Sequence, residues 1–338
     1  MRKKYFIAAL ILAFLLPSCG GGEEYRKTRE IMGTYVTITV ARGELPEMVV
    51  RGAVRDAFEE IERVDRLMST YKPESQLSEI NRLAGIAPVK VDPEVLETVR
   101  DALDVARRTD GAFDPTVGPL IRLWKIGSEE ARLPTSAEIE KAKELVDYRQ
   151  VVVDEPASTV YIKKKGMALD LGGIAKGYAS DLAVSLLRKR GLTGGIVAVA
   201  GDIKFFGTRD GGRPWKAGIQ HPRREGGLLA RLEPGDAAMS TSGDYERYFM
   251  KDGVRYHHII DPATGLPARG LISVTVLSKE SYLADGLSTA LFVMGPVRAL
   301  AFARAHPEVE ALMVTSEGRV LATGRFSGMD IEAVEADN

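Results

Sequence analysis

A glycine pair between an extended apolar segment and a helix is the feature that most constrains the fold of this chain. Residues 168–182 are ALDLGGIAKGYASDL, so an apolar stretch with Asp170 breaks at Gly172-Gly173 and continues as a helix that begins near Lys176. A strand that turns through glycines into a helix brings backbone N–H groups and the positive helix end to one point, which suits an anionic ligand. The same pattern also fits an ordinary strand-to-helix turn with a surface lysine. The segment alone leaves both interpretations open.

The segments around this turn predict a mixed fold in which strands come mostly in adjacent pairs. Alternating apolar residues at 36–40, and two short runs at 151–153 and 159–162, indicate strands. Apolar residues at helical spacing indicate helices over 46–68 and 92–108. Further strands are predicted at 196–200, 202–205, 215–220, 228–232, 309–314 and up to 323, and further helices at 135–147, 176–190 and 296–305. This order favours an α+β fold with mostly antiparallel sheets flanked by helices.

Composition and motif content exclude two other classes of protein. No Gly-x-Gly-x-x-Gly sequence follows a predicted strand, so a dinucleotide-binding Rossmann fold is not supported. The 338 residues, of which 45% are hydrophobic, are enough for a substantial core. The 46 basic and 47 acidic side chains nearly cancel, and the chain has no long run of basic and aromatic residues. A nucleic-acid partner is therefore not expected.

The N-terminus is typical of an export signal with a lipid anchor. Residues 2–4 are basic, and the apolar run 5–16 is short for a membrane span but matches the apolar region of a secretory signal. Cys19, the only cysteine, follows Leu-Pro-Ser and resembles the lipidated cysteine of a bacterial lipobox, although Pro17 is unusual there. A lone cysteine cannot form an internal disulfide, which favours attachment of a lipid such as palmitate. We predict a lipoprotein signal peptide at 1–18, a flexible tether at 19–28 and the folded domain at 29–338.

Three oxygen-bearing side chains share one face of a predicted helix. Asp285, Ser288 and Thr289 are three and four residues apart, so their oxygens lie on the same side. Hard oxygen ligands of this kind suit Mg²⁺, with water and phosphate completing its coordination. The alternative is a capping aspartate followed by ordinary helix hydroxyls. Spacing alone does not decide between them.

Other polar or aromatic segments also have two interpretations each. His257 and His258 invite a zinc interpretation, but adjacent strand residues point to opposite faces and cannot easily bind one ion. Tyr71 follows a predicted helix end, where its ring could face a ligand or cap the core. Residues 109–119 hold a phenylalanine and two acids among many turn formers, and the hydroxyls of 238–245 fit a polar turn.

Several motifs, in their order along the chain, resemble those of the ApbE-type flavin transferases. The motifs are MGT at 32–34, STY at 69–71, GAFDP at 111–115, DLGGIAKGY at 170–178, STSGD at 240–244, HIIDPATG at 258–265 and ADGLSTA at 284–290. The resemblance covers residues 29–324, nearly the whole chain after the predicted signal and tether. It implies the T-fold-like α+β architecture of that family, and the activity of an FAD:protein FMN transferase, which is often an exported lipoprotein.

The resemblance also implies roles for individual residues. The positions that match FAD contacts in the family are Met32, Tyr71, Ala112, Phe113, Asp114, Asp170, Lys176 and Ile259. The positions that match metal ligands are Gly173, through its carbonyl oxygen, and Asp285, Ser288 and Thr289. Some members have an acid in place of Ser288, so direct and water-mediated contact with the metal both remain open for this hydroxyl.

The implied reaction moves the FMN half of FAD to a protein. A Thr or Ser hydroxyl of an acceptor protein attacks the phosphorus on the FMN side of FAD, and AMP is released. Mg²⁺ and a cation such as Lys176 neutralise the phosphate charge. His258 is the predicted general base, because an imidazole titrates near neutral pH, and His257 is the second candidate.

Two other functions stay open on the sequence alone. With water in place of the acceptor hydroxyl, the same site would form an Mg-dependent FAD pyrophosphatase that yields FMN and AMP. Without any chemistry, the chain would be a periplasmic FAD-binding lipoprotein. The predicted partners are FAD, an acceptor protein of the kind found as a subunit of a membrane redox complex, and a membrane reached through the lipid anchor. The protein would face the periplasm or another extracytoplasmic space.

Overall fold

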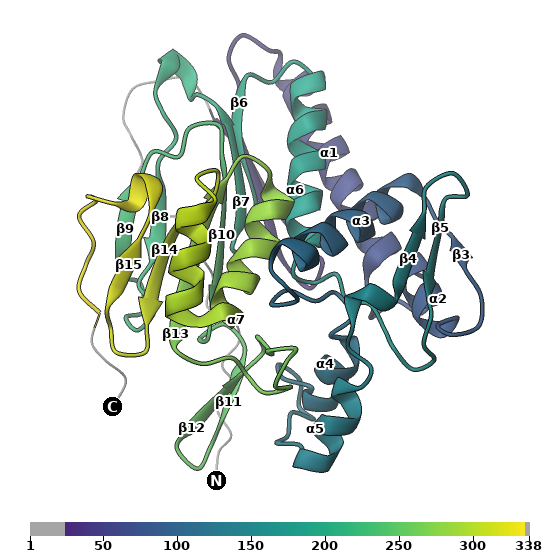
Figure 1. The fold of residues 1–338 in the computed structure, drawn as a ribbon. Helices are drawn as coiled ribbons and strands as arrows, with labels where there is room; N and C mark the ends of the chain where they lie inside the picture. Colours follow the sequence, from purple (N-terminus) through teal and green to yellow (C-terminus); the bar gives the residue numbers. More distant parts are fainter. Residues whose placement is uncertain (1–23, 335–338) are drawn as a thin grey trace.

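An eight-stranded antiparallel sheet forms the centre of the fold (Figure 1). The computed structural model describes residues 24–334. In sheet order the strands are β1 (Glu24–Ile31), β2 (Thr34–Ala41), β6 (Gly194–Val199), β7 (Asp202–Gly207), β10 (Ala238–Gly243), β13 (Leu271–Ser278), β14 (Glu310–Thr315) and β15 (Val320–Ala322). Each neighbouring pair runs antiparallel. This confirms the predicted α+β class and differs from a Rossmann fold, whose sheet is mostly parallel.

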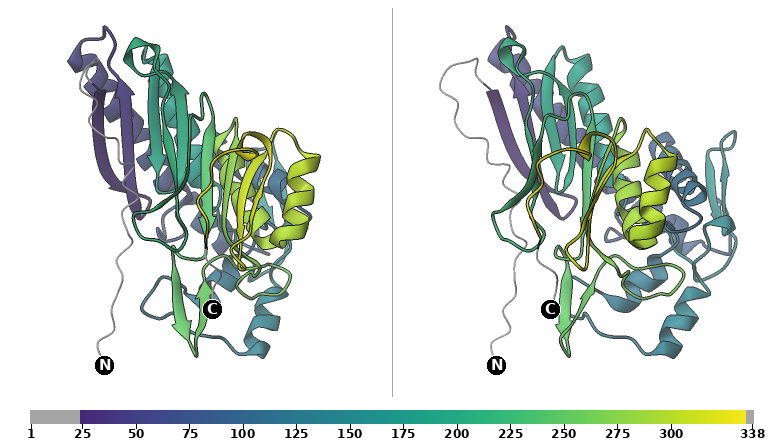
Figure 2. Two further views of the ribbon diagram at one scale, coloured as in Figure 1. Left: turned by 90° about the vertical axis from the view of Figure 1, so that its left-hand side faces the viewer. Right: turned by 60° about the vertical axis from the view of Figure 1, so that its left-hand side comes forward.

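One face of this sheet carries the long helices, and the other face carries a smaller layer (Figure 2). Along β14, Ala311 and Met313 face the helices, whereas Leu312 and Val314 face the second layer. This alternation is the two-residue period of a strand that is buried on both faces. The long helices are α1 (Glu47–Met68), α3 (Pro93–Arg108), α6 (Ala175–Lys189) and α7 (Ser281–Ala305). The second layer consists of the hairpin β8 (Ala217–Gln220)–β9 (Leu228–Leu232) and the segment after β15.

Smaller elements lie beside the helix layer (Figure 1). One group is α2 (Gln76–Arg82) with the sheet of β3 (Val89–Lys90), β5 (Thr159–Ile162) and β4 (Val151–Asp154), and the other is α4 (Gly118–Trp124), α5 (Ser136–Lys143) and the hairpin β11 (Tyr248–Lys251)–β12 (Val254–His257). In the second group the rings of Phe249, Tyr256 and Trp124 stack on one another. This stack attaches the hairpin to α4.

The predicted tether ends earlier than expected. β1 starts at Glu24, so residues 24–28 belong to the sheet and not to a linker. Its sequence, EYRKTREI, did not suggest a strand because β1 lies at the edge of the sheet, where charged side chains can remain in solvent and hide the apolar period. The predicted signal peptide at 1–18 and the lipidation site Cys19 lie outside the described residues.

Residues 238–245 were predicted as a polar turn, and this was wrong for most of the segment. Residues 238–243 form β10, an inner strand that pairs with β7 and β13. The hydroxyls of Ser240 and Ser242 face a hydroxyl of α7, so a polar strand is buried without losing hydrogen bonds. Low apolar content therefore concealed a central strand.

Helix α7 is longer and more apolar than expected. It joins the helix predicted near residue 285 to the one predicted at 296–305, with a kink at Gly295 (φ 72°) before Pro296. Within residues 24–334 it is the one helix whose length and composition would also allow a membrane span. About half of its most apolar stretch is buried, and it packs on α6, β10 and β13. It is therefore a core helix of this fold.

The stretch at 168–182 keeps its turn and helix but not its strand. Ala168 makes one parallel bridge to Val117, and the extended segment belongs to none of the sheets. α6 starts at Ala175, and Gly177 in its first turn lies against the backbone of α7. A Cβ on Gly177 would lie 2.3 Å from the carbonyl oxygen of Ser281. Glycine at this position therefore lets the starts of α6 and α7 touch.

Gly177→Ala should destabilise the protein. The added methyl meets backbone, which cannot rotate away, so we expect the free energy of unfolding to fall by about 1–3 kcal/mol or more in chemical denaturation. Gly52→Ala in α1 is the matched control, since a Cβ there meets nothing within 4 Å and alanine stabilises a helix by about 0.5–1 kcal/mol relative to glycine. Equal losses in both variants would contradict the packing argument.

Candidate active site

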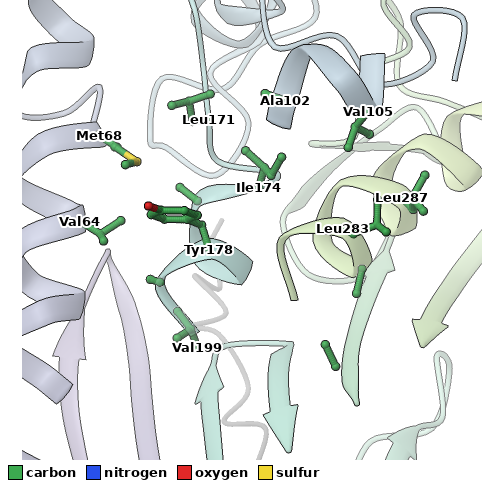
Figure 3. Packing of buried hydrophobic residues seen from close by; sticks show 14 of the residues in the cluster. Val64, Met68, Ala102, Val105, Leu171, Ile174, Tyr178, Val199, Leu283 and Leu287 are labelled. Carbon is green, nitrogen blue, oxygen red and sulfur yellow. The ribbon is translucent and has the colours of Figure 1, made fainter. Parts of the chain in front are cut away.

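The starts of α6 and α7 meet the ends of α1 and β6 near one aromatic ring. Figure 3 shows Tyr178 of α6 pointing toward Val64 and Met68 of α1, with Val199 of β6 close by. The Tyr178 hydroxyl donates a hydrogen bond of 2.9 Å to Oε2 of Glu97 on α3, which fixes the polar end of the ring. The starts of α6 and α7 and the loop after α1 carry many of the predicted site residues. The packing therefore brings them to one end of the helix layer.

Lys176 joins three separate segments through its ammonium group. Its Nζ lies 2.9 Å from the carbonyl oxygen of Gly172, 2.9 Å from Oδ2 of Asp202, and 3.2 and 3.3 Å from the two carboxylate oxygens of Asp285. An ammonium has three hydrogens to donate, so the protein itself can satisfy all of them. Lys176 therefore links the glycine turn, the start of β7 and the start of α7.

The two acids around Lys176 are buried and outnumber it. Asp202 is 3% exposed and Asp285 4% exposed, and Oδ2 of Asp285 also accepts the Gly177 N–H at 3.1 Å. Burial, together with the charge of Asp202, raises the pKa of Asp285 to about 7. Burial disfavours the Lys176 ammonium, but the two carboxylates outweigh this and raise its pKa above the usual range. With both acids ionised, the cluster has an excess negative charge that favours a second cation.

A chain of hydroxyl groups connects Asp202 to α7. Ser240 donates to the Asp202 carboxylate and lies 3.2 Å from Oγ of Ser288, and Ser242 lies 2.8 Å from the same Oγ. Ser288 itself donates to the backbone carbonyl of Asp285 at 2.9 Å. These bonds hold β10 against the start of α7.

The backbone of Gly173 lies beside Thr289 and Phe113. A Cβ built on Gly173 would lie 3.5 Å from Oγ1 of Thr289 and 3.1 Å from ring atom Cε2 of Phe113. The Gly173 carbonyl, the Asp285 carboxylate and the Thr289 hydroxyl are hard oxygens that fit Mg²⁺, and the excess negative charge has the sign that this ion needs. In residues 24–334, no three Asp, Glu, His or Cys side chains gather as a metal site, so a carbonyl and hydroxyls would have to complete the set. Ser288 fits less well, because it is fully buried and its Oγ is already engaged.

Asp202, Ser240 and Ser242 were not among the predicted site residues. Asp202 follows the two-residue turn Ala200-Gly201 and is the first residue of β7. An acid at the start of a largely apolar strand was the available signal for it. Ser240 and Ser242 are two residues apart, so on a strand their hydroxyls share a face. Because residues 238–245 were interpreted as a turn, the shared face of Ser240 and Ser242 was not recognised.

Two predicted FAD contacts lie near the end of α1. Tyr71 is 85% exposed, so the interpretation of its ring as a cap on the core is wrong. Met32 occupies the two-residue turn between β1 and β2, with φ 57°. Arg29 of β1 bonds Glu62 of α1 at 3.1 Å, which places this turn near the helix end that precedes Tyr71. An exposed aromatic ring in this region is available to a ligand.

The predicted contacts at 112–114 are buried, and the Asp114 carboxylate accepts three hydrogen bonds from the protein. Ala112 is 7% exposed and Phe113 5%. Oδ1 of Asp114 accepts the backbone N–H and the hydroxyl of Thr116 at 2.8 and 2.6 Å, and Oδ2 accepts the N–H of Tyr148 at 3.1 Å. The carboxylate therefore shapes the loop that carries Ala112 and Phe113.

Asp170 and Ile259 occupy positions that support their neighbours. The Asp170 carboxylate accepts the Gly172 N–H at 2.8 Å and so shapes the glycine turn. Ile259 is 5% exposed, and its N–H donates to Nδ1 of His257 at 3.3 Å. Asp170 thereby supports the turn that contains Gly173, and Ile259 is adjacent to His258.

The two adjacent histidines have different surroundings. His257 is buried, with Nε2 2.8 Å from the carbonyl of Ala268 and Nδ1 accepting the Ile259 N–H, so both nitrogens are used and the ring has a structural role. His258 is half-buried, and its Nδ1 lies 3.3 Å from the carbonyl oxygen of Arg247. No group in residues 24–334 bonds its Nε2.

The charge state of His258 also suits a base. Burial, and then the charge of Arg247, lowers the pKa of His258 well below its usual range, so the ring is neutral at pH 7. The Lys176 charge acts in the same direction. The ring of the neighbouring His257 packs edge-on against Phe292 of α7, with 5.3 Å between the ring centroids, so this segment lies against the helix that carries Asp285. Of the two histidines, His258 is therefore the one with a neutral ring and a nitrogen available to accept a proton.

Comparisons with known proteins agree with this arrangement of the chain. A family model described as the ApbE family matches residues 32–313. An FAD:protein FMN transferase of Treponema pallidum is 36% identical over 324 residues, which cover 90% of this chain and 89% of that protein. One of Vibrio cholerae is 34% identical, with 91% and 93% covered.

Solved structures show the same fold. The ApbE protein of Thermotoga maritima has a TM-score of 0.84 and 36% identity, and covers 92% of this chain and 100% of its own. The flavin transferase ApbE of Vibrio cholerae has a TM-score of 0.79 and 33% identity, with 91% and 99% covered, and a variant of it with a histidine replaced by glycine has also been solved. The chain described here belongs to the ApbE family.

Proposed function

We propose that the protein is an FAD:protein FMN transferase that uses Mg²⁺, modifies a Ser or Thr hydroxyl of an acceptor protein and releases AMP. The observation that carries the proposal is the meeting of a base and a cation site. His258 has an unbonded imidazole nitrogen among the described residues, and the adjacent His257 packs against Phe292 of α7, the helix that carries Asp285 of the buried Lys176–Asp202–Asp285 cluster. Transfer of a phosphoryl-type group to a hydroxyl needs positioning, charge neutralisation and removal of a proton.

The proposed reaction begins with proton removal by His258. Its Nδ1–H is directed at the Arg247 carbonyl, so Nε2 carries the lone pair and accepts the proton of the acceptor hydroxyl. The hydroxyl oxygen bonds to the phosphorus on the FMN side of FAD. The bond from that phosphorus to the bridging oxygen breaks, and AMP leaves with this oxygen. Help from such a base is worth about 10²- to 10⁴-fold.

The cluster around Lys176 would serve the cation and the phosphates. The Gly173 carbonyl, Asp285 and Thr289 would hold Mg²⁺, which when bound supplies positive charge to the pyrophosphate and its leaving group. Lys176 holds the Asp285 carboxylate and the Gly172 carbonyl in place. Because the protein can satisfy all its hydrogens, Lys176 would act on FAD mainly by its charge.

One assay separates this function from the two alternatives. The protein is incubated with FAD, Mg²⁺ and a candidate acceptor protein, and the products are analysed by mass spectrometry. A gain of one FMN on a Ser or Thr of the acceptor, with release of AMP, is the expected result. Free FMN and AMP without a modified acceptor would identify a pyrophosphatase, and unchanged FAD would identify a carrier.

The pH dependence of transfer should reflect the lowered pKa of His258. A free histidine titrates at about pH 6.5, and the neutral form is the one that accepts a proton. Because the pKa of His258 lies well below that value, the rate at saturating Mg²⁺ should be level from pH 8 down to about pH 6.5 and fall only at lower pH. Rates measured over pH 5–8 check this. A loss of rate that begins above pH 7 would contradict it.

Tyr71→Ala should weaken FAD binding without affecting the fold. The ring is 85% exposed, so the free energy of unfolding should change by at most about 0.5 kcal/mol. Loss of stacking on a planar ring costs about 1–3 kcal/mol, which is about a 5- to 150-fold weaker FAD affinity in fluorescence titration. Tyr35→Ala, at another exposed tyrosine (54%), is the control that should leave binding unchanged.

The proposed location is an extracytoplasmic membrane surface. The basic residues 2–4, the apolar run 5–16 and the lone Cys19 support export and lipid attachment. An anchored enzyme would face acceptor subunits of membrane redox complexes in the same compartment. Mass spectrometry of the N-terminal peptide of the mature protein tests this, with an acylated Cys19 as the expected result.

A further inference from the structure

Asp202 is the acid of the Lys176 cluster that has no proposed contact with FAD or Mg²⁺. It is 3% exposed, and its Oδ2 lies 2.9 Å from Nζ of Lys176. Its other oxygen accepts the hydroxyl of Ser240. Its backbone is fixed as well, because it pairs with Val199 across the β6–β7 turn and with Ser240 of β10. Asp202 is therefore a buried acid whose side chain and backbone are both fixed, and it is not a mobile surface charge.

We infer that Asp202 is a positioning residue for the cation site, which acts through Lys176 and through its own charge. This inference rests on the proposed function, because it concerns the proposed Mg²⁺ site. Asp202 holds the Lys176 ammonium where it can also bond the Gly172 carbonyl and the Asp285 carboxylate. The glycine turn and the start of α7, which carry the proposed ligands Gly173, Asp285 and Thr289, are thereby held together.

The charge of Asp202 has a separate effect. Lys176 alone would neutralise Asp285 and leave no net attraction for a divalent cation. With Asp202 present, two carboxylates surround one ammonium, and the cluster is negative overall when both acids are ionised. Supporting groups outside the first coordination sphere change metal affinity by about 10- to 100-fold. Asp202 should contribute an effect of this size although it is not a ligand.

The test measures Mn²⁺ binding to the whole protein without FAD, by electron paramagnetic resonance of free Mn²⁺. The unmodified protein should bind Mn²⁺, and Asp202→Asn should bind it about 10- to 100-fold more weakly at an unchanged melting temperature. Asp56→Asn is the matched control. Asp56 also forms ion pairs, with Arg55 at 2.7 Å and with Arg190. Arg190 lies at the far end of α6, about 20 Å along the helix from Lys176. It should leave the affinity unchanged.

A double variant separates the charge from any damage to the fold. Lys176→Met/Asp202→Asn restores the net charge of the cluster, so its Mn²⁺ affinity should recover toward that of the unmodified protein. Equal affinities of Asp202→Asn and the unmodified protein would overturn the inference and leave the proposed function intact. Equal weakening in the single and double variants would overturn the role of charge. No Mn²⁺ binding by the unmodified protein would instead overturn the proposed metal site and, with it, this inference.

Discussion

His258→Ala should lower the rate of FMN transfer by about 10²- to 10⁴-fold and leave FAD binding nearly unchanged. The half-buried imidazole is directed by the Arg247 carbonyl, and its Nε2 is the unbonded nitrogen that can take the hydroxyl proton. Replacement by alanine removes this nitrogen, and with it the proposed base. Single-turnover transfer to an acceptor and fluorescence titration of FAD measure the two quantities separately. Added imidazole should restore part of the lost rate in the variant.

The control for this experiment is another histidine with a similar bond. His306 at the end of α7 also has Nδ1 near a backbone carbonyl, that of Phe302 at 2.9 Å, but it lies at the opposite end of the helix from Asp285. His306→Ala should leave transfer unchanged. Equal losses of FAD affinity and transfer in His258→Ala, with no effect of imidazole, would show that the ring supports binding and is not the base.

The fold class could be predicted from local patterns because most strands pair with neighbours in sequence. The hairpins β4–β5, β6–β7 and β14–β15 each consist of adjacent strands with a recognisable period. Strands β1, β3, β10, β11, β12 and β13 were not predicted. Two of them have their period hidden, β1 by charged side chains at a sheet edge and β10 by hydroxyls that face α7. Both are cases in which the environment of a side chain, and not its polarity, decides burial.

The candidate site could be predicted only as separate motifs. Asp285, Ser288 and Thr289 were identified by type and spacing, and the roles of Asp170, Gly173 and Lys176 by the resemblance to the family, but the contact between the two groups depends on tertiary packing. Asp202 is the clearest example of what was missed. It lies 26 residues after Lys176 and 83 before Asp285 in the sequence, yet in the structure it bonds the ammonium that joins them. Spacing within a helix predicts a shared face, but it contains no information on which distant acid completes a charge cluster.

Lys176→Met should destabilise the protein by about 3–5 kcal/mol, because it leaves two buried carboxylates without their cation. The side chains of Asp202 and Asp285 are each 5% exposed, and that of Lys176 is 25% exposed, so water cannot replace most of the lost interaction. Urea denaturation without divalent cations measures the change. Lys72→Met is the matched control. Lys72 bonds Asp65 at 2.6 Å at a more exposed position (35%), so its loss should cost at most about 1 kcal/mol.

Removal of the second acid should reverse most of the damage caused by Lys176→Met. In Lys176→Met/Asp202→Asn, Asp285 is the one acid of the cluster that remains. It keeps the hydrogen bond from the Gly177 N–H at 3.1 Å. The double variant should therefore be more stable than Lys176→Met, although it carries one more substitution, and this is the sign of coupled neighbours. Added Mg²⁺ should stabilise Lys176→Met as well, because a bound cation would compensate the two carboxylates. If the double variant is no more stable than Lys176→Met, repulsion between Asp202 and Asp285 is not what Lys176 relieves.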